Sequence, residues 1–320
     1  MSVRDRLKTK IKSRVIDINL LFFNNISNTG HYWETDWIKL IFKTDNKFNI
    51  KINQEIDKEK IYENPIIVTS DPDDDYIKKY IEKDLDFCII HLSDEAYIHN
   101  ISIYNEPKCK FIFRNYYSTY FTNFSHKILN FDLGYKQGLW DNYFGLNPDK
   151  IKIGSRKYKW SFCGNINKSD RSAYISDISD IKPHFIHKIM GWNTPDSLSA
   201  QEYRNIMLNT IFVPCLIGNV NVDTFRLYEA LECGCIPIIF KYQRKFGKHG
   251  CKDMTNYYEK LFGNHPIITV TNWFDIKEIM ENFLENEYKL EKKRLEIYRW
   301  WKNRIFDTQN SVNKILCKFF

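Results

Sequence analysis

Short apolar runs alternate with more polar, helix-like stretches along the first half of the chain. A short apolar run predicts a buried strand, and apolar residues three or four apart predict a helix. Residues 73–83 and 97–104 are expected to be helical or loop connections. The predicted strands are residues 15–23, 65–69, 87–91, 110–114 and 127–131. This alternation is typical of an α/β domain with a Rossmann-like sheet, in which ligands lie beyond the carboxyl ends of the strands.

The same alternation returns in the second half of the chain. Helices are predicted over residues 168–178 and 223–233. The predicted strands are residues 158–163, 210–214, 236–240 and 266–270. After Asn272 the pattern becomes long and helical and continues through Leu316. Its first apolar stripe consists of Ile276, Ile279, Met280, Phe283 and Leu284. We expect this closing helix to return to the first domain.

A basic segment separates the two halves. Residues 146–158 contain Pro148, Gly154 and four lysine or arginine residues, which favours a linker at this place. A chain of 320 residues also exceeds what a single hydrophobic core usually serves. We therefore expect two Rossmann-like domains that face each other across a cleft, formed by residues 1–150 and 151–320.

The composition narrows the class of protein. Hydrophobic residues make up 43% of the chain and aromatic residues 16%, which suits two packed cores and is unlike a disordered chain. The net charge of +7 is spread along the chain beyond its first fourteen residues. Because no basic stripe is present, we do not expect nucleic acid as a partner. The positive surplus suits an anionic small ligand, although such a surplus commonly serves solubility alone.

The cysteines and the apolar segments bear on the compartment. The chain has eight cysteines, mostly in apolar runs, with no CxxC pair and no metal-ligand spacing. Free thiols in a reducing compartment are the simplest interpretation. No segment approaches the roughly 20 apolar residues of a membrane span, and the start of the chain lacks the apolar core of a signal peptide. We expect a cytoplasmic protein without a transmembrane anchor.

The most informative stretch is residues 209–240, NTIFVPCLIGNVNVDTFRLYEALECGCIPIIF. It predicts a strand, a loop, a helix, a turn and a second strand. Gly234 is expected to close the helix, and Pro237 to begin the second strand. This scaffold would hold the start of the helix close to a ligand.

The residues at the predicted helix start suit an anion. Asp223 is expected to cap the helix, whose free backbone N–H groups and positive dipole end favour a diphosphate. Thr224 and the loop 218–222 would lie beside the same phosphates. Arg226 stands three positions further, and Glu229 lies about one turn beyond it on the same face. This spacing favours a guanidinium for phosphate and a carboxylate for ribose hydroxyls. The alternative is an ordinary ion pair on a helix surface.

This stretch resembles the exostosin-like glycosyltransferases, whose C-terminal domain carries the pattern Arg-x-x-Glu-Ala-Leu-x-x-Gly-Cys-x-Pro. The matching residues are Arg226, Glu229, Ala230, Leu231, Gly234, Cys235 and Pro237. Residues 161–165, followed by Arg171, resemble the Phe-x-Gly element of the same family. That region serves the donor phosphates in the family, so the resemblance implies donor binding by Gly164, Asn165 and Arg171. The alternative for Arg171 is a solvated arginine at a helix start.

A third match lies in the first half. Residues 91–95, 114–117 and 133–135 look like the N-terminal half of the ribitol xylosyltransferase relatives of this family. The resemblance implies a GT-B fold, with the acceptor on the N-terminal side and the nucleotide-sugar donor on the C-terminal side. It also implies transfer, with inversion, to a hydroxyl of a glycan or glycoconjugate. The missing membrane anchor and Golgi stem depart from the animal members and leave the acceptor open.

The first domain is expected to supply the base. Asp94 and Glu95 follow the predicted strand 87–91, so either could deprotonate the acceptor hydroxyl. Glu95 could equally begin a helix. A UDP-sugar is the expected donor, with a GDP-sugar as the alternative. Since arginines would neutralise the diphosphate, no cofactor and no metal are expected.

A metal-dependent alternative rests on the run from Asp71 to Asp75. Carboxylates after a strand could hold Mg²⁺ or Mn²⁺ on a donor diphosphate, as in a GT-A enzyme. The place of this run before a periodic stretch favours a capped helix start. His184 and His187 lie three apart, but no further ligand stands at a recognised spacing.

Two further alternatives concern binding. A catalytically silent sugar- or nucleotide-binding protein would keep the scaffold and lack the base. Trp300 and Trp301 could form a sugar platform, but the pattern around them favours a packed amphipathic helix.

Overall fold

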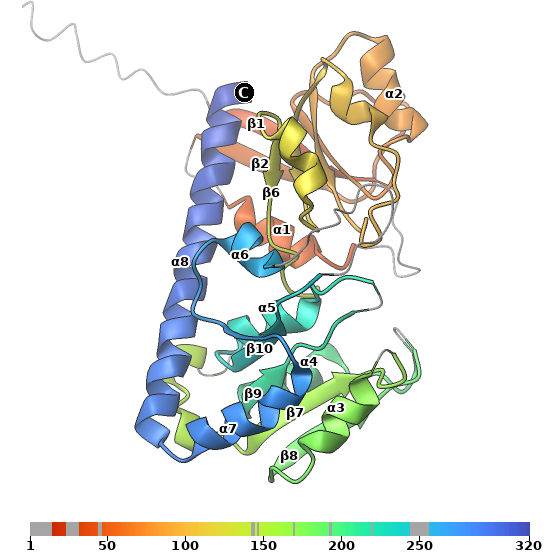
Figure 1. Ribbon diagram of the computed structural model, residues 1–320. Helices are drawn as coiled ribbons and strands as arrows, with labels where there is room; N and C mark the ends of the chain where they lie inside the picture. The colour runs from red at the N-terminus through yellow and green to blue at the C-terminus, as the bar shows by residue number, and fades with distance from the viewer. Residues whose placement is uncertain are drawn as a thin grey trace, which may run out of the picture.

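The computed structural model describes residues 15–23, 32–43, 47–141, 145, 147–168, 170–191, 194–218, 220–243 and 256–320. Within these residues each half of the chain forms one parallel sheet, and helices cover the sheets (Figure 1). The seven described cysteines are free, as predicted, and Cys251 lies outside the described residues. None of the helices in these ranges is long and apolar enough to cross a membrane.

The first sheet has the strand order β2-β1-β3-β4-β5-β6. Its strands are β1 (Ile16–Phe22), β2 (Phe48–Asn53), β3 (Pro65–Thr69), β4 (Phe87–His91), β5 (Cys109–Arg114) and β6 (Ile128–Asn130). Its helices are α1 (Thr35–Ile41) and α2 (Asp75–Glu82), and the 3-10 turns are η2 (Ser102–Asn105) and η3 (Thr119–Phe124). All residues of β3 and β4 are buried, because both faces of a parallel sheet are covered.

The second sheet has the strand order β11-β10-β9-β7-β8. Its strands are β7 (Tyr158–Gly164), β8 (His184–Lys188), β9 (Thr210–Pro214), β10 (Ile236–Phe240) and β11 (Ile268–Val270). Its helices are α3 (Arg171–Asp177), α4 (Ala200–Leu208), α5 (Phe225–Glu232), α6 (Tyr257–Phe262) and α7 (Ile276–Leu284), with the 3-10 turn η6 (Trp273–Asp275). The strand order reverses between β7 and β9, since β8 lies on one side of β7 and β9 to β11 lie on the other. Ligands bind at such a switch point in doubly wound folds.

The last helix, α8 (Glu287–Phe319), runs along both halves of the molecule (Figure 1). Near its middle Trp301 is fully buried, and its ring stacks on that of Trp37 from α1 at 5.5 Å. Further along, the Gln309 side chain donates to the Leu40 carbonyl at 2.9 Å. These contacts confirm the prediction that the C-terminal helix returns to the first domain.

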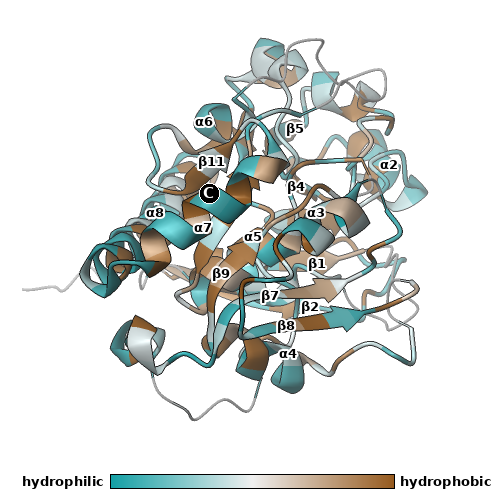
Figure 2. Cartoon of the chain, turned by 60° about the horizontal axis from the view of Figure 1, so that its bottom comes forward, coloured by the Kyte–Doolittle hydropathy of each residue, from teal (hydrophilic) through white to brown (hydrophobic). Residues whose placement is uncertain are grey.

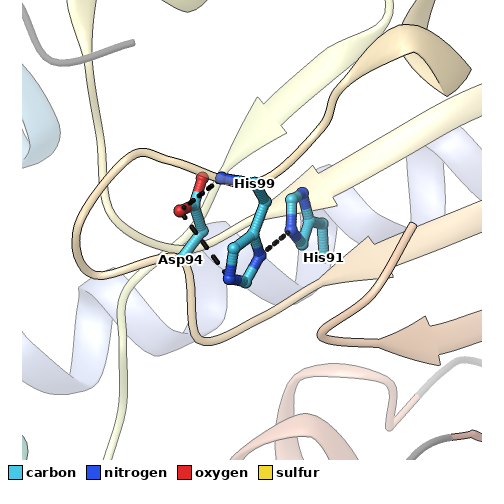
Figure 3. A group of neighbouring side chains, drawn as sticks. All are labelled: His91, Asp94 and His99. Atoms are coloured by element: carbon cyan, nitrogen blue, oxygen red, sulfur yellow. Dashed lines mark hydrogen bonds and ion pairs between the residues drawn. The ribbon is translucent and has the colours of Figure 1, made fainter. Parts of the chain in front are cut away.

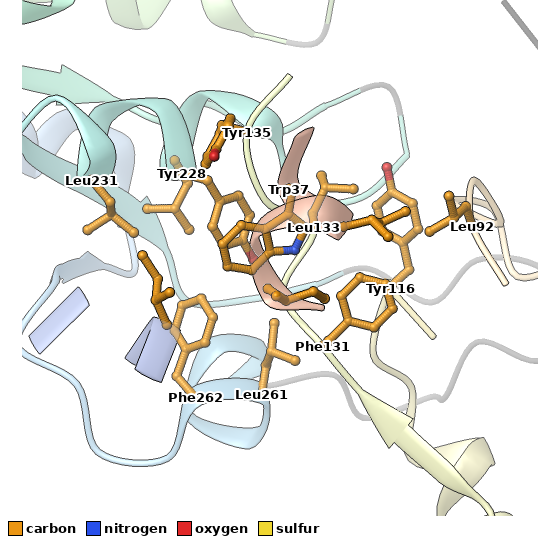
Figure 4. Packing of buried hydrophobic residues seen from close by; sticks show 14 of the residues in the cluster. Trp37, Leu92, Tyr116, Phe131, Leu133, Tyr135, Tyr228, Leu231, Leu261 and Phe262 are labelled. Atoms are coloured by element: carbon orange, nitrogen blue, oxygen red, sulfur yellow. The ribbon is translucent and has the colours of Figure 1, made fainter. Parts of the chain in front are cut away.

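The hydrophobic core is continuous between the two halves. Figure 4 shows Tyr228 and Leu231 of α5 packed with Phe262 of α6 and near Trp37 and Leu133 of the first half. In Figure 2 the hydrophobic colour gathers on the inner strand β9, while the outer turns of α8 are mostly hydrophilic. The Trp301 N–H also donates to the Glu232 carboxylate at 2.7 Å, which fixes α8 to α5.

The segment expected to be a linker packs against α8. It contains two 3-10 turns, η4 (Pro148–Lys150) and η5 (Ile153–Ser155). The buried Arg294 of α8 donates to the Pro148 carbonyl at 3.3 Å, and Glu291 accepts from the Ile153 N–H at 2.9 Å. The connection between the two sheets is therefore held by the same helix that joins them.

Two predicted helix ends can be compared with the structure. The prediction for Gly234 is confirmed, since this residue has a φ of +63° directly after the Cys233 C-cap of α5. The run 71–75 forms the expected helix start, because the Asp74 side chain accepts from the Tyr76 N–H at 2.8 Å as the N-cap of α2.

Candidate active site

A cavity of about 540 Å³ lies where carboxyl ends of strands from both sheets meet. Its N-terminal wall comes from residues after β1, β4, β5 and β6, and its C-terminal wall from residues after β7, β8 and β9. This volume is typical of small-molecule sites. Eight of the nine predicted site residues line the cavity: Glu95, Gly164, Asn165, Arg171, Asp223, Thr224, Arg226 and Glu229.

Arg226 belongs to the first turn of α5, and its guanidinium lies on the C-terminal wall at the end of β7. Its guanidinium stacks over the Phe162 ring at 4.4 Å, and its Nη2 donates to the Cys163 carbonyl at 2.9 Å. Its buried Nε has no hydrogen-bond partner among the described residues. Gly164 is required here, because a Cβ at this residue would lie 2.7 Å from Nη2 of Arg226. The strand end therefore holds the arginine and leaves donor capacity unused.

Arg171 joins the loop after β7 to the loop after β9 on the same wall. Its Nη1 donates to the Asn165 carbonyl at 2.8 Å, and its Nε donates to the Ile217 carbonyl at 3.0 Å. Burial, together with the positive charge of Arg226, lowers the pKa of Arg171 to about 9. Within the described ranges neither arginine forms an ion pair with a carboxylate. Two positive groups without paired anions favour an anionic ligand.

The first turn of α5 faces the same cavity. Thr224 is the N-cap residue and makes no side-chain capping bond, and its buried Oγ1 has no partner among the residues described. Both Thr224 and Phe225 line the cavity. The turn therefore offers backbone N–H groups to an anion at this place.

The expected cap at Asp223 is wrong by one residue, and its carboxyl group points elsewhere. Its Oδ2 accepts from the hydroxyls of Tyr228 at 3.1 Å and Tyr257 at 3.3 Å. Burial raises the pKa of Asp223 to about 8. The group is therefore mostly neutral at pH 7 and does not repel an anion beside it.

Glu229 lies one turn beyond Arg226, as the spacing predicts. Its carboxylate accepts from the Tyr203 hydroxyl at 2.8 Å, and burial raises its pKa. Lys136 of the first half also lines the cavity and attracts Glu229, while its ammonium lies 4.1 Å from the centre of the Trp33 ring. Glu229 thus stands between groups of both halves of the chain.

Glu95 reaches from the first half to the loop that was expected to hold phosphates. Its Oε1 accepts from the backbone N–H groups of Val220 at 3.2 Å and Asn221 at 3.3 Å. Gly218 lies against it, because a Cβ there would be 3.2 Å from this oxygen. The carboxylate therefore joins the two halves across the cavity.

The prediction that Asp94 faces the cleft needs correction. This residue is 1% exposed and does not line the cavity. Its Oδ2 accepts from Arg114 at 2.7 Å, and its Oδ1 accepts from the backbone N–H groups of Ile98 and His99. Figure 3 shows the carboxylate turned toward His99, next to His91. A carboxylate engaged in this way holds its own loop and cannot reach an acceptor hydroxyl in the cavity.

His91, Asp94 and His99 form a cluster with metal-ligand atoms within 4.8 Å of one another. The fully buried Arg114 stands inside this cluster, since its Nη1 lies 2.8 Å from Nδ1 of His91 and its Nη2 bonds to Asp94. A guanidinium therefore supplies the positive charge that a cation would bring. The cluster is better explained as a buried polar network.

The two histidines that lie three apart in the sequence have other partners. His184 stacks on Trp160 at 4.8 Å, and the His187 ring bonds to the Asp196 carbonyl at 2.7 Å. The only group of three or more candidate ligands among the described residues is the cluster above.

Sequence patterns did not reveal two polar residues of the N-terminal wall, Glu34 and Lys136. Glu34 follows β1 and is the N-cap residue of α1, in a stretch without a recognisable motif. The residue is 2% exposed, and burial raises the pKa of its carboxyl group to about 7. A pKa in this range is typical of a group that exchanges protons near neutral pH.

Comparisons with known proteins agree with this geometry. Residues 143–320 match the model of the RXYLT1 C-terminal domain family. No curated protein sequence matches the chain. Among solved structures, an Anabaena protein, Alr3699/HepE, in complex with UDP and glucose is 10% identical with a TM-score of 0.53. The match covers 94% of this chain and 100% of that one. An α1,3-fucosyltransferase is 10% identical with a TM-score of 0.46, covering 93% of this chain and 91% of that one.

The likeness to the Anabaena structure shows the fold. The two parallel sheets facing one cavity are those of the GT-B fold, as predicted from the sequence. The GT-A alternative that used the run 71–75 is therefore wrong. That run caps α2 and does not line the cavity.

Proposed function

The protein belongs to the RXYLT1 C-terminal domain family and is a glycosyltransferase, and from this we propose that it moves a sugar from a UDP-sugar to a hydroxyl of a glycan or glycoconjugate. The observation that carries this proposal is the pair of arginines, Arg171 and Arg226, on the C-terminal wall of the cavity. Neither is paired with a carboxylate among the described residues, and both lie beside the uncapped start of α5. The Anabaena neighbour, solved with UDP and glucose, supports UDP as the nucleotide.

The donor diphosphate would lie against this wall. Arg226 has an unused Nε, the first turn of α5 offers N–H groups, and Gly164 leaves the space that the Arg226 guanidinium occupies. Arg171 would add its charge from behind while it holds the loops after β7 and β9. The neutral Asp223 would not oppose the negative charge. Glu229 would accept hydrogen bonds from ribose or sugar hydroxyls, since its acceptor-rich carboxylate faces the cavity.

We propose that these cationic groups take the place of a metal ion. As the bond from the anomeric carbon to the diphosphate breaks, negative charge grows on the leaving oxygen. Arg226 and the helix start would stabilise that charge in a partly closed cavity, where electrostatic interactions are stronger than in water. Attack by the acceptor from the opposite, N-terminal side would invert the anomeric configuration.

Donor binding tests this proposal. UDP-xylose, UDP-glucose, UDP-N-acetylglucosamine and GDP-fucose would be titrated calorimetrically in EDTA, against the wild type and the Arg226→Ala protein. One UDP-sugar is expected to bind the wild type, and Arg226→Ala is expected to weaken its Kd at least about tenfold. Loss of one charge-assisted hydrogen bond costs about 1.5–3 kcal/mol, which corresponds to that change.

Arg299→Ala is the matched control, because Arg299 is an exposed arginine of α8 outside the cavity. Its donor affinity should equal that of the wild type. Binding that Arg226→Ala leaves intact would disprove the donor site, and binding only with Mn²⁺ would disprove the metal-free proposal.

A further inference from the structure

Four carboxyl groups line the cavity among the described residues: Glu34, Glu95, Asp223 and Glu229. Two backbone N–H groups hold the Glu95 carboxylate, and tyrosine hydroxyls bond to those of Asp223 and Glu229. Asp223 and Glu229 also belong to the wall that the donor phosphates would occupy. Glu34 and Glu95 lie on the opposite, N-terminal wall. Glu34 stands apart from Glu95, because its Oε2 has no hydrogen-bond partner among the described residues, whereas Glu95 is held by the loop after β9.

The Glu34 carboxylate has one oxygen bound and one free. Its Oε1 accepts from the side-chain N–H of Asn115 at 3.2 Å. Its buried Oε2 has no hydrogen-bond partner in the part of the chain that is described. None of the described cationic side chains forms an ion pair with it. A buried acceptor without a donor is costly, which favours a ligand hydroxyl at this place.

The segment around Glu34 is held firmly from both sides. The Trp33 carbonyl accepts from the Gln137 N–H at 2.7 Å, and the Asp36 carboxylate accepts from the Gly138 N–H at 2.8 Å. Asn115 follows β5 directly and is itself 1% exposed. The carboxylate is therefore positioned by the sheet edge and does not depend on a substrate for its orientation.

The groups that act on Glu34 are uncharged at neutral pH. Tyr32 and Tyr116 lie close enough for their own pKa to be raised by its charge, after burial as the main cause. Burial raises the pKa of Glu34 to about 7, and hydrogen bonding from its own backbone N–H and from the Asn115 side chain partly opposes this rise. Lys136 and Glu95 line the same cavity, but neither contributes to the pKa shift of Glu34. A carboxylate in such surroundings is a stronger base than an exposed one.

We infer that Glu34 is the catalytic general base, which takes the proton from the acceptor hydroxyl through its free Oε2. The inference rests on the proposed glycosyl transfer and replaces Asp94 and Glu95 in that role. In the step, the acceptor oxygen forms a bond to the anomeric carbon as its proton passes to Oε2. The bond from that carbon to the diphosphate oxygen breaks, and its electron pair leaves with the UDP. Glu34 ends protonated and returns its proton to solvent.

The test is the Glu34→Gln variant of the full chain, which keeps the shape and the Asn115 contact and removes the base. Turnover would be read as UDP release from the UDP-sugar that binds the wild type, with water and added polyols as acceptors. The variant is expected to lose about 10²–10⁴-fold in kcat, the usual contribution of a general base, with donor Kd unchanged. Glu82→Gln, an exposed glutamate of α2, is the matched control.

The pH dependence separates a base from a merely structural residue. Since the base must be deprotonated, kcat of the wild type should rise through about pH 7 to a plateau, and Glu34→Asp should keep part of the activity. Glu34→Gln with wild-type kcat and the same acid limb would overturn the inference while the transferase proposal stands. A wild type that binds no nucleotide sugar would overturn the proposed function, and the inference with it.

Discussion

Gly164 shows how one residue shapes the donor wall. It ends β7 with a φ of +152°, which side chains other than glycine rarely adopt, and Arg226 fills the space where a Cβ would lie. The resemblance to the Phe-x-Gly element predicted a donor role for this glycine. The structure adds a physical reason, since the glycine lets the arginine stack on Phe162 beside the strand end.

Gly164→Ala should therefore weaken donor binding as well as stability. The new methyl group must push the guanidinium away, and the backbone strain adds about 1–3 kcal/mol. Thermal unfolding with and without UDP-sugar would measure both effects. Gly263→Ala is the matched control, because Gly263 also has a positive φ, of +72°, but nothing within 4 Å of a Cβ. It should lower stability and keep the donor-induced shift; an equal shift in Gly164→Ala would contradict the role of this residue.

The candidate base illustrates what a sequence cannot reveal at this scale. Asp94 and Glu95 follow a strand, as the rule for ligand sites requires, but Arg114 arrives 20 residues after Asp94 and occupies its carboxylate. The Glu34 carboxylate is held by Asn115, which lies 81 residues later in the chain. Neither pairing leaves a local pattern. Arg226 and Glu229 could be found because both stand on one helix, where spacing fixes their direction.

At the scale of elements, the apolar inner strands could be predicted with their bounds, and two polar edge strands could not. The other two edge strands, β6 and β11, were predicted with slightly longer bounds. β3, β4, β9 and β10 have the predicted bounds, because both faces of each are buried and their sequences are continuous apolar runs. β2 and β8 stand at the edges of their sheets and carry many polar residues, so no continuous apolar run in the sequence predicts them. α4 was missed although Ser199 and Glu202 form a capping box, a signal visible in the sequence.

Trp301 is the residue of α8 that we expect to contribute most to the stability of the molecule. Trp301 lies between Trp37 of the first half and Tyr228 of the second, at centroid distances of 5.5 Å and 5.7 Å. Trp301→Ala should cost about 3–5 kcal/mol of unfolding free energy, the range for a buried aromatic residue. Urea unfolding would measure this change. The neighbouring Trp300 is only half-buried, so Trp300→Ala should cost clearly less; equal costs would contradict the role given to Trp301.

At the scale of the whole molecule, the cavity belongs to both halves of the chain. Glu95 of the first half reaches the loop after β9. The Tyr257 hydroxyl also links the halves, because it accepts from the Tyr117 N–H at 3.1 Å and donates to the Asp223 carboxyl group at 3.3 Å. The family match covers residues 143–320, which contain the proposed donor wall, whereas Glu34 lies in the part before that match. The division into donor and acceptor sides that we propose follows the two sheets.

The most direct test of the proposed transfer is release of UDP from a UDP-sugar in EDTA, compared between the wild type and Arg226→Ala. If the arginines replace a metal ion, the wild type should release UDP steadily without divalent cations. A loss of at least about 10²-fold is also expected in Arg226→Ala, since a single preorganised donor to a developing negative charge contributes that much. Wild-type release that requires Mn²⁺, or release that Arg226→Ala retains in full, would contradict the metal-free donor site. Donor binding without any release would indicate a sugar-nucleotide-binding protein instead of a transferase.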